Sequence, residues 1–245
     1  MNEGTVLVDL GGWTEGELEN TMHEAFRIED AGPRIAFLSG FFLGLRYRES
    51  TLIGDIDTAE VFVINLSEVD CFTFIDYIEA MSLSDSFERF LENLRKVRYR
   101  NGKVDYVSRK HFFTDWAEYE PAFVDDVTTQ IGGGRDKSAV KMLNLKEDGT
   151  FYLPGIRPYH RSVNYIPSEK IDDAVLQALK PGDYAGIYSS KQGLDVSHVG
   201  IVIKDEESIV LRHASSDRRY RKVIDQDLKE YIEEKAGLII LRPRG

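Results

Sequence analysis

Apolar positions in the first half of the chain recur at helical spacing. Residues 70–81 place three apolar side chains on one stripe, namely Phe74, Ile78 and Met81, and residues 84–97 repeat the pattern. Apolar side chains spaced three and four residues apart predict amphipathic helices in both segments. Asp76 and Glu79 lie on the first of these helices, and we expect this acid pair on its solvated face.

The N-terminal segments carry further signals. A threonine followed three residues later by glutamate opens residues 14–27, and this capping-box pattern predicts a helix there. We expect Pro33 to break the chain after that helix. Residues 35–45 are apolar enough to be buried, and the β-branched run 61–66 predicts a short strand.

The periodicity changes after Pro181. Four segments with strand character follow, at residues 183–189, 198–204, 208–214 and 238–242, with turn residues between them. Prolines at 154, 158 and 167 punctuate an extended middle segment. Helices first and strands later predict an α+β fold. We expect a single domain over residues 1–245, mainly helical over 14–130 and mainly β over 181–243.

Composition limits the function classes. The chain has 245 residues, 42% of them hydrophobic and 13 of them phenylalanine, which suits a folded protein with a sizeable core. A net charge of −11 argues against a general nucleic-acid binder, which needs a basic face, and against an anionic membrane surface. No signal peptide and no membrane-spanning segment is visible.

The chain has one cysteine, Cys71, which directly follows Asp70 at the predicted start of a helix. A single cysteine allows no internal disulfide and no two-plus-two metal knuckle, so we expect neither metal nor cofactor. A helix N-terminus lowers a thiol pKa through its positive end and free N–H groups. Asp70 suits the cap position, and the N–H of Cys71 could help hold an oxyanion, an effect worth about 3 kcal/mol.

Two histidines can serve the thiol. His198 and His213 lie 15 residues apart on two predicted strands, with an acidic turn between them. In a hairpin they would lie on neighbouring strands, so we assign His198 as the base and His213 as the residue that orients it. Separately, a lone cysteine is most often a small core residue and a strand histidine a structural one. The combination favours a cysteine hydrolase.

The motifs resemble those of the N-acetylmuramoyl-L-alanine-amidase-like family, a branch of the NlpC-type papain-like hydrolases of bacterial cell walls. The most specific element is Leu-Asp-Val-Ser-His-Val-Gly, at residues 194–200, followed by Arg-His-Ala-Ser at 212–215. Further matches are Gly-Leu-Arg-Tyr at 44–47, Val-Asp-Cys-Phe-Thr-Phe at 69–74, Val-Arg-Tyr-Arg-Asn-Gly at 97–102, Ser-Arg-Lys-His-Phe at 108–112 and Trp116.

This resemblance implies a papain-like fold and hydrolysis of an amide in peptidoglycan or muropeptides, with the muramoyl–L-alanine bond as the leading target. It places the nucleophile at Cys71, the base at His198 and the third polar residue at His213. It implies substrate or oxyanion contacts from Tyr47, Asp70 and Ser197. It also implies a location in the bacterial cell envelope or periplasm, and we expect a monomer. A stem-peptide endopeptidase, an acyltransferase and a non-catalytic peptidoglycan-fragment binder stay open as alternatives.

One position departs from the family pattern. Many relatives have serine after the Asp-Cys pair, where it helps the aspartate to grip a free amino group of the substrate. This chain has Phe72. Recognition of a free stem amine through Asp70 is therefore in question.

Other marked residues have two interpretations each. Residues 95–110 hold seven basic residues and one acid, so Arg109 could bind stem carboxylates, or the run could be a solvated helix end. Trp116 could stack on a sugar, although a buried indole is commoner, and we expect His111 to be structural. The glycine run 132–134 resembles a phosphate loop, but Asp136 precedes Lys137 where that loop needs glycine, so we reject nucleotide binding.

Overall fold

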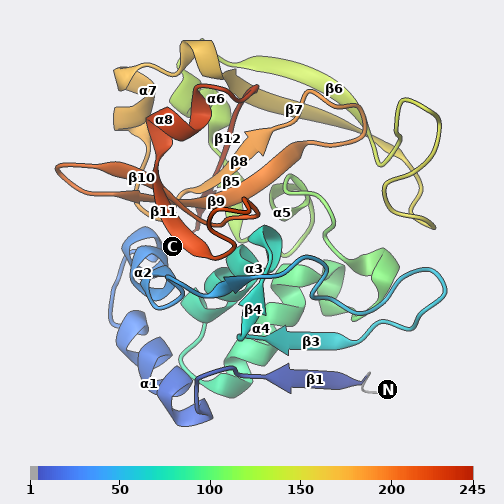
Figure 1. Cartoon of the computed structure of the whole chain (residues 1–245), viewed down its shortest axis with the longest axis vertical. Helices are drawn as coiled ribbons and strands as arrows, with labels where there is room; N and C mark the ends of the chain where they lie inside the picture. The colour runs from blue at the N-terminus through green and yellow to red at the C-terminus, as the bar shows by residue number, and fades with distance from the viewer. Residues whose placement is uncertain (1–4, 245) are drawn as a thin grey trace.

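The computed structural model describes residues 5–244, in which helices from the first half of the chain pack beneath a sheet built mainly by the second half (Figure 1). The four longer helices are α1 (Glu15–Phe26), α2 (Ala31–Gly40), α3 (Cys71–Ser82) and α4 (Phe87–Arg98). The predicted helices at 14–27, 70–81 and 84–97 are thus confirmed. Thr14 and Glu17 form the expected capping box on α1.

Pro33 does not break the chain, contrary to our expectation. It is the third residue of α2, within the first helical turn. Backbone N–H groups in that turn have no partner inside the helix, so a proline there removes no hydrogen bond. The helix then continues through the buried side chains of Ile35 and Leu38 to Gly40.

Two short parallel pairs lie in the helical half. One pairs β1 (Val6–Asp9) with β3 (Phe62–Asn65), and the other pairs β2 (Arg46–Tyr47) with β4 (Glu68–Val69). The predicted strand at 61–66 is β3. The second pair is close to the start of α3, because β4 ends at Val69 and Asp70 caps the helix.

The large sheet has eight strands within residues 5–244, all paired antiparallel, in the order β11-β10-β9-β8-β12-β7-β6, with β5 also on β12. Its strands are β5 (Val124–Asp126), β6 (Lys137–Leu143), β7 (Tyr159–Pro167), β8 (Tyr184–Tyr188), β9 (Val196–Lys204), β10 (Ile209–Ala214), β11 (Val223–Asp227) and β12 (Gly237–Pro243). Short helices connect or flank them: α5 (Asp115–Glu118), α6 (Thr128–Gly132), α7 (Asp173–Ala178) and α8 (Leu228–Ile232).

Four strands match the segments predicted after Pro181, but β5, β6, β7 and β11 were not foreseen. β6 and β11 are largely exposed, with only two buried residues in the first and one in the second, so neither carries a clear apolar alternation. The middle segment, which we expect from the sequence to be extended, forms the β6–β7 hairpin of the sheet. Among the described residues, no helix is long and apolar enough to cross a membrane.

Helix α3 is enclosed on all sides. It packs against α2 and α4 below and against β9 and β10 above, and every residue from Thr73 to Ser82 is buried. Asp76 and Glu79 are therefore not on a solvated face, and our expectation for them was wrong. Each is only 1% exposed.

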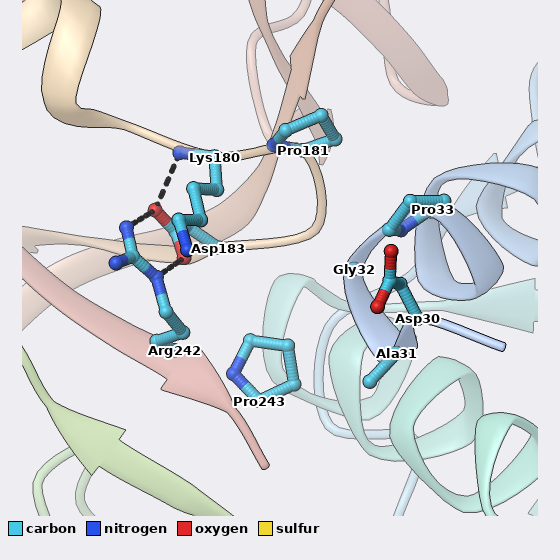
Figure 2. Close-up of a pocket in the computed structure, with 9 residues that line it drawn as sticks. All are labelled: Asp30, Ala31, Gly32, Pro33, Lys180, Pro181, Asp183, Arg242 and Pro243. Carbon is cyan, nitrogen blue, oxygen red and sulfur yellow. Dashed lines mark hydrogen bonds and ion pairs between the residues drawn. The ribbon is translucent and has the colours of Figure 1, made fainter. Parts of the chain in front are cut away.

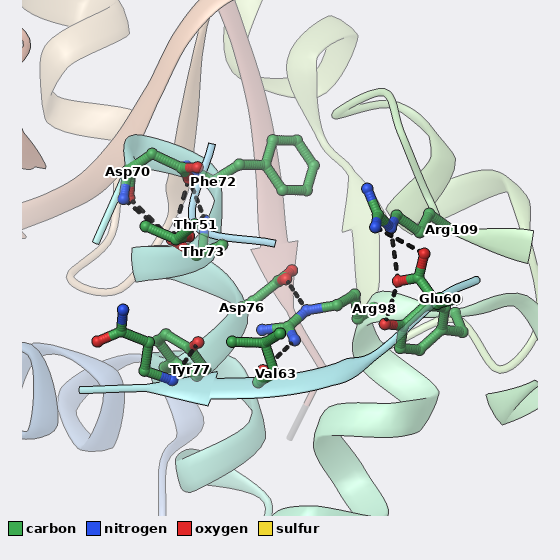
Figure 3. A network of polar contacts seen from close by, with 12 residues as sticks. Thr51, Glu60, Val63, Asp70, Phe72, Thr73, Asp76, Tyr77, Arg98 and Arg109 are labelled. Carbon is green, nitrogen blue, oxygen red and sulfur yellow. Dashed lines mark hydrogen bonds and ion pairs between the residues drawn. The ribbon is translucent and has the colours of Figure 1, made fainter. Parts of the chain in front are cut away.

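Both buried acids have partners from other elements, and Figure 3 shows the partner of Asp76. Asp76 accepts a hydrogen bond from Nε of Arg98 at 2.8 Å, and Arg98 also donates to the carbonyl of Val63 at 2.6 Å. Glu79 accepts from the hydroxyl of Tyr184 at 2.6 Å, which joins α3 to β8. Burial raises the pKa of Asp76 to about 6 and that of Glu79 to about 7.

Replacing Arg98 by alanine should destabilise the protein strongly. The change would leave Asp76 buried without its counter-charge, which typically costs about 3–5 kcal/mol. Arg89→Ala on the same helix is the matched control, since Arg89 and its partner Glu92 are exposed and the change should cost about 0.5 kcal/mol or less. Urea unfolding of both variants measures the difference, and equal costs would contradict this account.

Candidate active site

The cap of α3 sets the position of Cys71. Oδ1 of Asp70 accepts hydrogen bonds from the backbone N–H of Phe72 at 3.0 Å and of Thr73 at 2.7 Å (Figure 3). The hydroxyl of Thr73 accepts in return from the N–H of Asp70 at 3.0 Å. This reciprocal cap makes Cys71 the first residue of the helix, as expected. It also engages Oδ1 of Asp70, which is then less available to a substrate amine.

The β9–β10 hairpin brings the two histidines together. Ile201 pairs with Arg212, so Gly200 lies across from His213, and His198 lies two residues further along the same face. Nε2 of His198 is 2.6 Å from Nδ1 of His213. The sequence-based expectation that the two rings are within reach of each other is confirmed.

Gly200 makes room for this diagonal pair. A Cβ at this position would lie 2.9 Å from Cβ of His213 and 2.9 Å from the carbonyl oxygen of Arg212. Both distances are below real Cβ contacts, so any side chain at residue 200 would push the His213 ring away. The glycine between the strands is therefore part of the site's construction.

Cys71, His198 and Ser197 line one cavity of about 200 Å³. Cys71 as a residue is partly exposed, while its thiol is buried. Most other lining side chains are apolar, among them Phe72, Phe112 and Leu153. Within residues 5–244 the structure contains no hydrogen bond between Sγ of Cys71 and either histidine ring. Catalytic hydrogen bonds are often long in ligand-free sites and shorten when substrate binds.

Burial shifts the pKa values of Cys71 and of both histidines. It raises the pKa of Cys71 to about 12, with the nearby Asp70 acting in the same direction, against the N–H groups of Val199, Cys71 and Phe72. Burial also lowers the pKa of His198 to about 3 and lowers that of His213. We had expected a lowered thiol pKa, and the shift is in the opposite direction. At neutral pH the free protein therefore holds a neutral thiol beside a neutral imidazole.

Tyr47 lies close to Cys71 but does not line the cavity. Its side chain is buried, and the pKa of Tyr47 is raised to about 12 by burial and then by the charge of a Cys71 thiolate. The guanidinium of Arg221 covers its ring at 4.6 Å. On α8, Tyr231 faces both histidines, with its ring 5.1 Å from that of His213.

Arg109 and Trp116 do not line the cavity. Arg109 donates twice to Glu60, at 2.7 and 2.6 Å, and once to the carbonyl of Gly54, so its guanidinium is already engaged (Figure 3). Trp116 is 2% exposed and packs edge-on against Phe72, 6.1 Å between ring centroids. Trp116 thus supports the cavity from behind. His111, expected to be structural, does line the cavity, and its Nε2 lies 2.8 Å from the carbonyl oxygen of Tyr106.

Two buried polar residues that the sequence analysis missed hold the loops around the cavity. Asn144 exchanges hydrogen bonds with the backbone of Leu153 at 2.7 and 2.9 Å, and donates to the carbonyl of Ile156 at 2.7 Å. Asp195 accepts from the N–H and the hydroxyl of Thr114 at 2.8 and 2.9 Å. Asn144 has no local sequence signal. Asp195 stands in the Leu-Asp-Val-Ser-His-Val-Gly element, but its partner Thr114 comes from a distant segment.

A larger cavity, about 330 Å³, lies elsewhere, between the start of α2 and the loop before β8 (Figure 2). Asp183 dominates its polar wall and accepts hydrogen bonds from Arg242 and from the N–H of Lys180. Asp183 and Arg242 thus satisfy each other, and the lining of this cavity includes neither cysteine nor histidine. Among the described residues, no cluster of three or more His, Cys, Asp or Glu side chains is arranged to hold a metal ion.

Cys71 and His198 line one mainly apolar cavity, and His198 contacts His213 behind it. The chain belongs to the AmiA-like family, described as N-acetylmuramoyl-L-alanine amidase-like, whose model matches residues 37–238. No curated protein sequence matches the chain.

Solved structures share the fold. A Legionella pneumophila protein superposes with a TM-score of 0.78 at 23% identity over 94% of both chains, a similarity of fold alone. An N-acetylmuramoyl-L-alanine amidase from Bacteroides uniformis has a TM-score of 0.71 at 27% identity, covering 88% of this chain and 99% of its own. A Bacteroides fragilis protein named as a candidate xylanase has a TM-score of 0.66 at 28% identity, covering 83% and 98%.

Replacing Gly200 by alanine should displace His213 and lower stability by about 1–3 kcal/mol, because the new methyl overpacks the hairpin. Gly16→Ala in α1 is the control, since a Cβ there meets nothing within 4 Å and alanine favours a helix. Thermal unfolding should show a lower Tm for the first variant and an unchanged or higher Tm for the second. A neutral Gly200→Ala would refute the steric argument.

Alkylation of Cys71 by iodoacetamide should be slow at neutral pH and should rise steadily toward alkaline pH. The reason is that the thiolate is the nucleophile and the pKa of Cys71 is raised to about 12. Cys71 is the only cysteine, so mass spectrometry of the labelled protein reports it alone. A rate plateau extending into the acidic range would instead reveal a preformed thiolate–imidazolium pair.

Proposed function

We propose that this protein hydrolyses the amide between the muramoyl group and L-alanine in peptidoglycan fragments, through a thioester on Cys71, and that its fold is the NlpC type of the papain-like hydrolases. The observation that carries the proposal is the shared cavity of Cys71 and His198, with His198 tied to His213 at 2.6 Å. Family membership and the Bacteroides uniformis amidase support the same reaction class. Such a substrate would place the protein in the cell envelope.

The residues account for each step. The sulfur of Cys71 attacks the carbonyl carbon, an S–C bond forms, and the thiol proton passes to His198. The backbone N–H of Cys71 is the proposed donor to the oxyanion, at the start of helix α3. Collapse breaks the C–N bond while His198 returns the proton to the leaving amine. Water, deprotonated by His198, then cleaves the thioester and releases the acid.

A neutral thiol and a neutral His198 are compatible with this order of steps. Since the free thiol and imidazole are both uncharged, proton transfer accompanies attack instead of preceding it. Substrate that fills the cavity must bring Sγ and the His198 ring within hydrogen-bonding distance. The thiol then becomes reactive only where a carbonyl carbon is present.

The cavity wall favours the muramoyl–L-alanine bond over bonds further along the stem. Phe72, Phe112 and Leu153 present apolar surface beside the thiol. The lactyl methyl of muramic acid and the methyl of alanine flank that bond, whereas the glutamyl and diamino-acid bonds carry charged carboxylates or ammonium groups. Among the lining residues the only carboxylate is Asp195, which is buried and already bound by Thr114. Charged stem groups therefore have no partner at the cavity.

The same lining argues against glycoside hydrolysis, the activity in the name of the Bacteroides fragilis relative. That reaction needs two carboxylates facing the scissile bond, about 5–9 Å apart. The cavity offers one carboxylate, Asp195, whose oxygens accept from Thr114 and Val196.

Cys71→Ala should abolish cleavage of defined muropeptides, and His198→Ala should lower kcat by about 1,000-fold or more, as loss of the base does in related chemistry. His160→Ala is the control, because His160 is exposed on β7 and should leave kcat unchanged. Mass spectrometry should identify free muramic acid derivatives and peptides that begin with L-alanine.

Other products would assign a different activity to the protein. Fragments cut within the stem would make the protein an endopeptidase. Transfer to an added amine would make it an acyltransferase. Binding without cleavage by the unmodified protein would refute an enzyme altogether.

A further inference from the structure

The two active-site histidines are continued by a third polar side chain on the next strand. Nε2 of His213 lies 2.8 Å from Oε1 of Gln226 on β11, while Nε2 of His198 lies 2.6 Å from Nδ1 of His213. Gln226 is partly exposed and does not line the cavity. This series of hydrogen bonds therefore runs from the cavity to the outer strand of the sheet, β11.

The donors and acceptors available to each group fix the direction of the hydrogen bonds that link His198, His213 and Gln226. An amide oxygen only accepts, so Nε2 of His213 must carry the proton. Both rings are neutral, because burial lowers the pKa of each, so Nδ1 of His213 is bare and accepts. Nε2 of His198 must then donate to it. This leaves Nδ1 of His198 without a proton, in a ring that shares the cavity with Cys71.

We propose that Gln226 is a positioning residue that keeps His198 in the one tautomer able to take the thiol proton. This inference rests on the proposed cysteine mechanism and adds a residue to it. If the Gln226 amide presented its NH₂ group to His213, both hydrogen bonds of the series would exchange donor and acceptor. His198 would then carry its proton on Nδ1, the nitrogen that His213 does not engage, and would not be a base.

The same series of hydrogen bonds also stabilises the charge that forms on His198 once the reaction starts. When His198 accepts the thiol proton, both of its nitrogens carry protons, and Nδ1 of His213 still accepts from one of them. The Oε1 of Gln226 accepts in turn from His213, so the positive charge at His198 is stabilised by two aligned acceptors. Without Gln226, the second ring loses the partner that fixes its orientation.

Several charged or titratable groups face the pair from the elements around it. Asp225 neighbours His213 on the β11 side, and Lys235 follows α8 and acts on His198. Tyr231 of α8 covers both rings. Cys71 and its neighbour Asp70 lie at the start of α3. A change at residue 226 leaves all of these groups in place.

The test compares Gln226→Leu, Gln226→Glu and the control Gln130→Leu, an exposed glutamine on α6. Leucine removes the acceptor, so kcat should fall about 10- to 100-fold, the range seen when residues that orient a histidine are removed. KM should stay within about twofold, because Gln226 does not line the cavity. Glutamate also only accepts, so it should restore kcat at neutral to alkaline pH. Its charge should move the acidic limb of the pH profile upward.

Nitrogen-15 NMR of labelled histidine reads the tautomer without any substrate. The five histidines can be assigned from single variants. In the unmodified protein we expect a proton on Nε2 and none on Nδ1 of His198, and a mixture of tautomers in Gln226→Leu.

An unchanged tautomer and kcat in Gln226→Leu would overturn the inference, as would equal losses in the leucine and glutamate variants with no shift of the pH profile. If the unmodified protein cleaves no muropeptide but shows the expected tautomers, the proposed function fails while the positioning role of Gln226 stands.

Discussion

The contact between the N-terminal end of α3 and strand β9 is the constraint on which the site depends. It places Cys71, the first residue of the helix, beside His198 and the N–H of Val199. Together with α2, α4 and β10, this strand buries the helix from Thr73 onward, so its polar residues need partners of their own. Arg98 and Tyr184 supply them for Asp76 and Glu79. The helix that carries the thiol is thereby fixed from both sides.

Burial also determines how the thiol behaves. A sulfur inside an apolar cavity is costly to ionise, and a buried imidazole is costly to protonate, so both charged forms are disfavoured in the free protein. A pair of this kind is inert toward water and small solutes until a substrate completes the site. The apolar lining of the cavity thus holds the thiol in its neutral form.

The helical half of the fold was predictable because its signals are local. Apolar spacing marks α3 and α4, and the capping box marks α1. The four strands predicted after Pro181 carry continuous apolar runs, which mark them locally as well. In contrast, β6 and β11 are too exposed to carry such a pattern, and Pro33 is compatible with α2 only because of its place in the first turn. Loop anchors such as Asn144 depend on partners that the local sequence does not reveal.

The sequence by itself determined the three candidate groups Cys71, His198 and His213, because the helix cap and the motifs around both histidines are read over a few adjacent residues. Only the tertiary structure decided that Arg109 is engaged by Glu60, that the thiol pKa is raised, and that Gln226 extends the histidine pair. The physical reason is that burial and hydrogen-bond partnership depend on which distant elements pack together. A residue's neighbours along the chain do not report them.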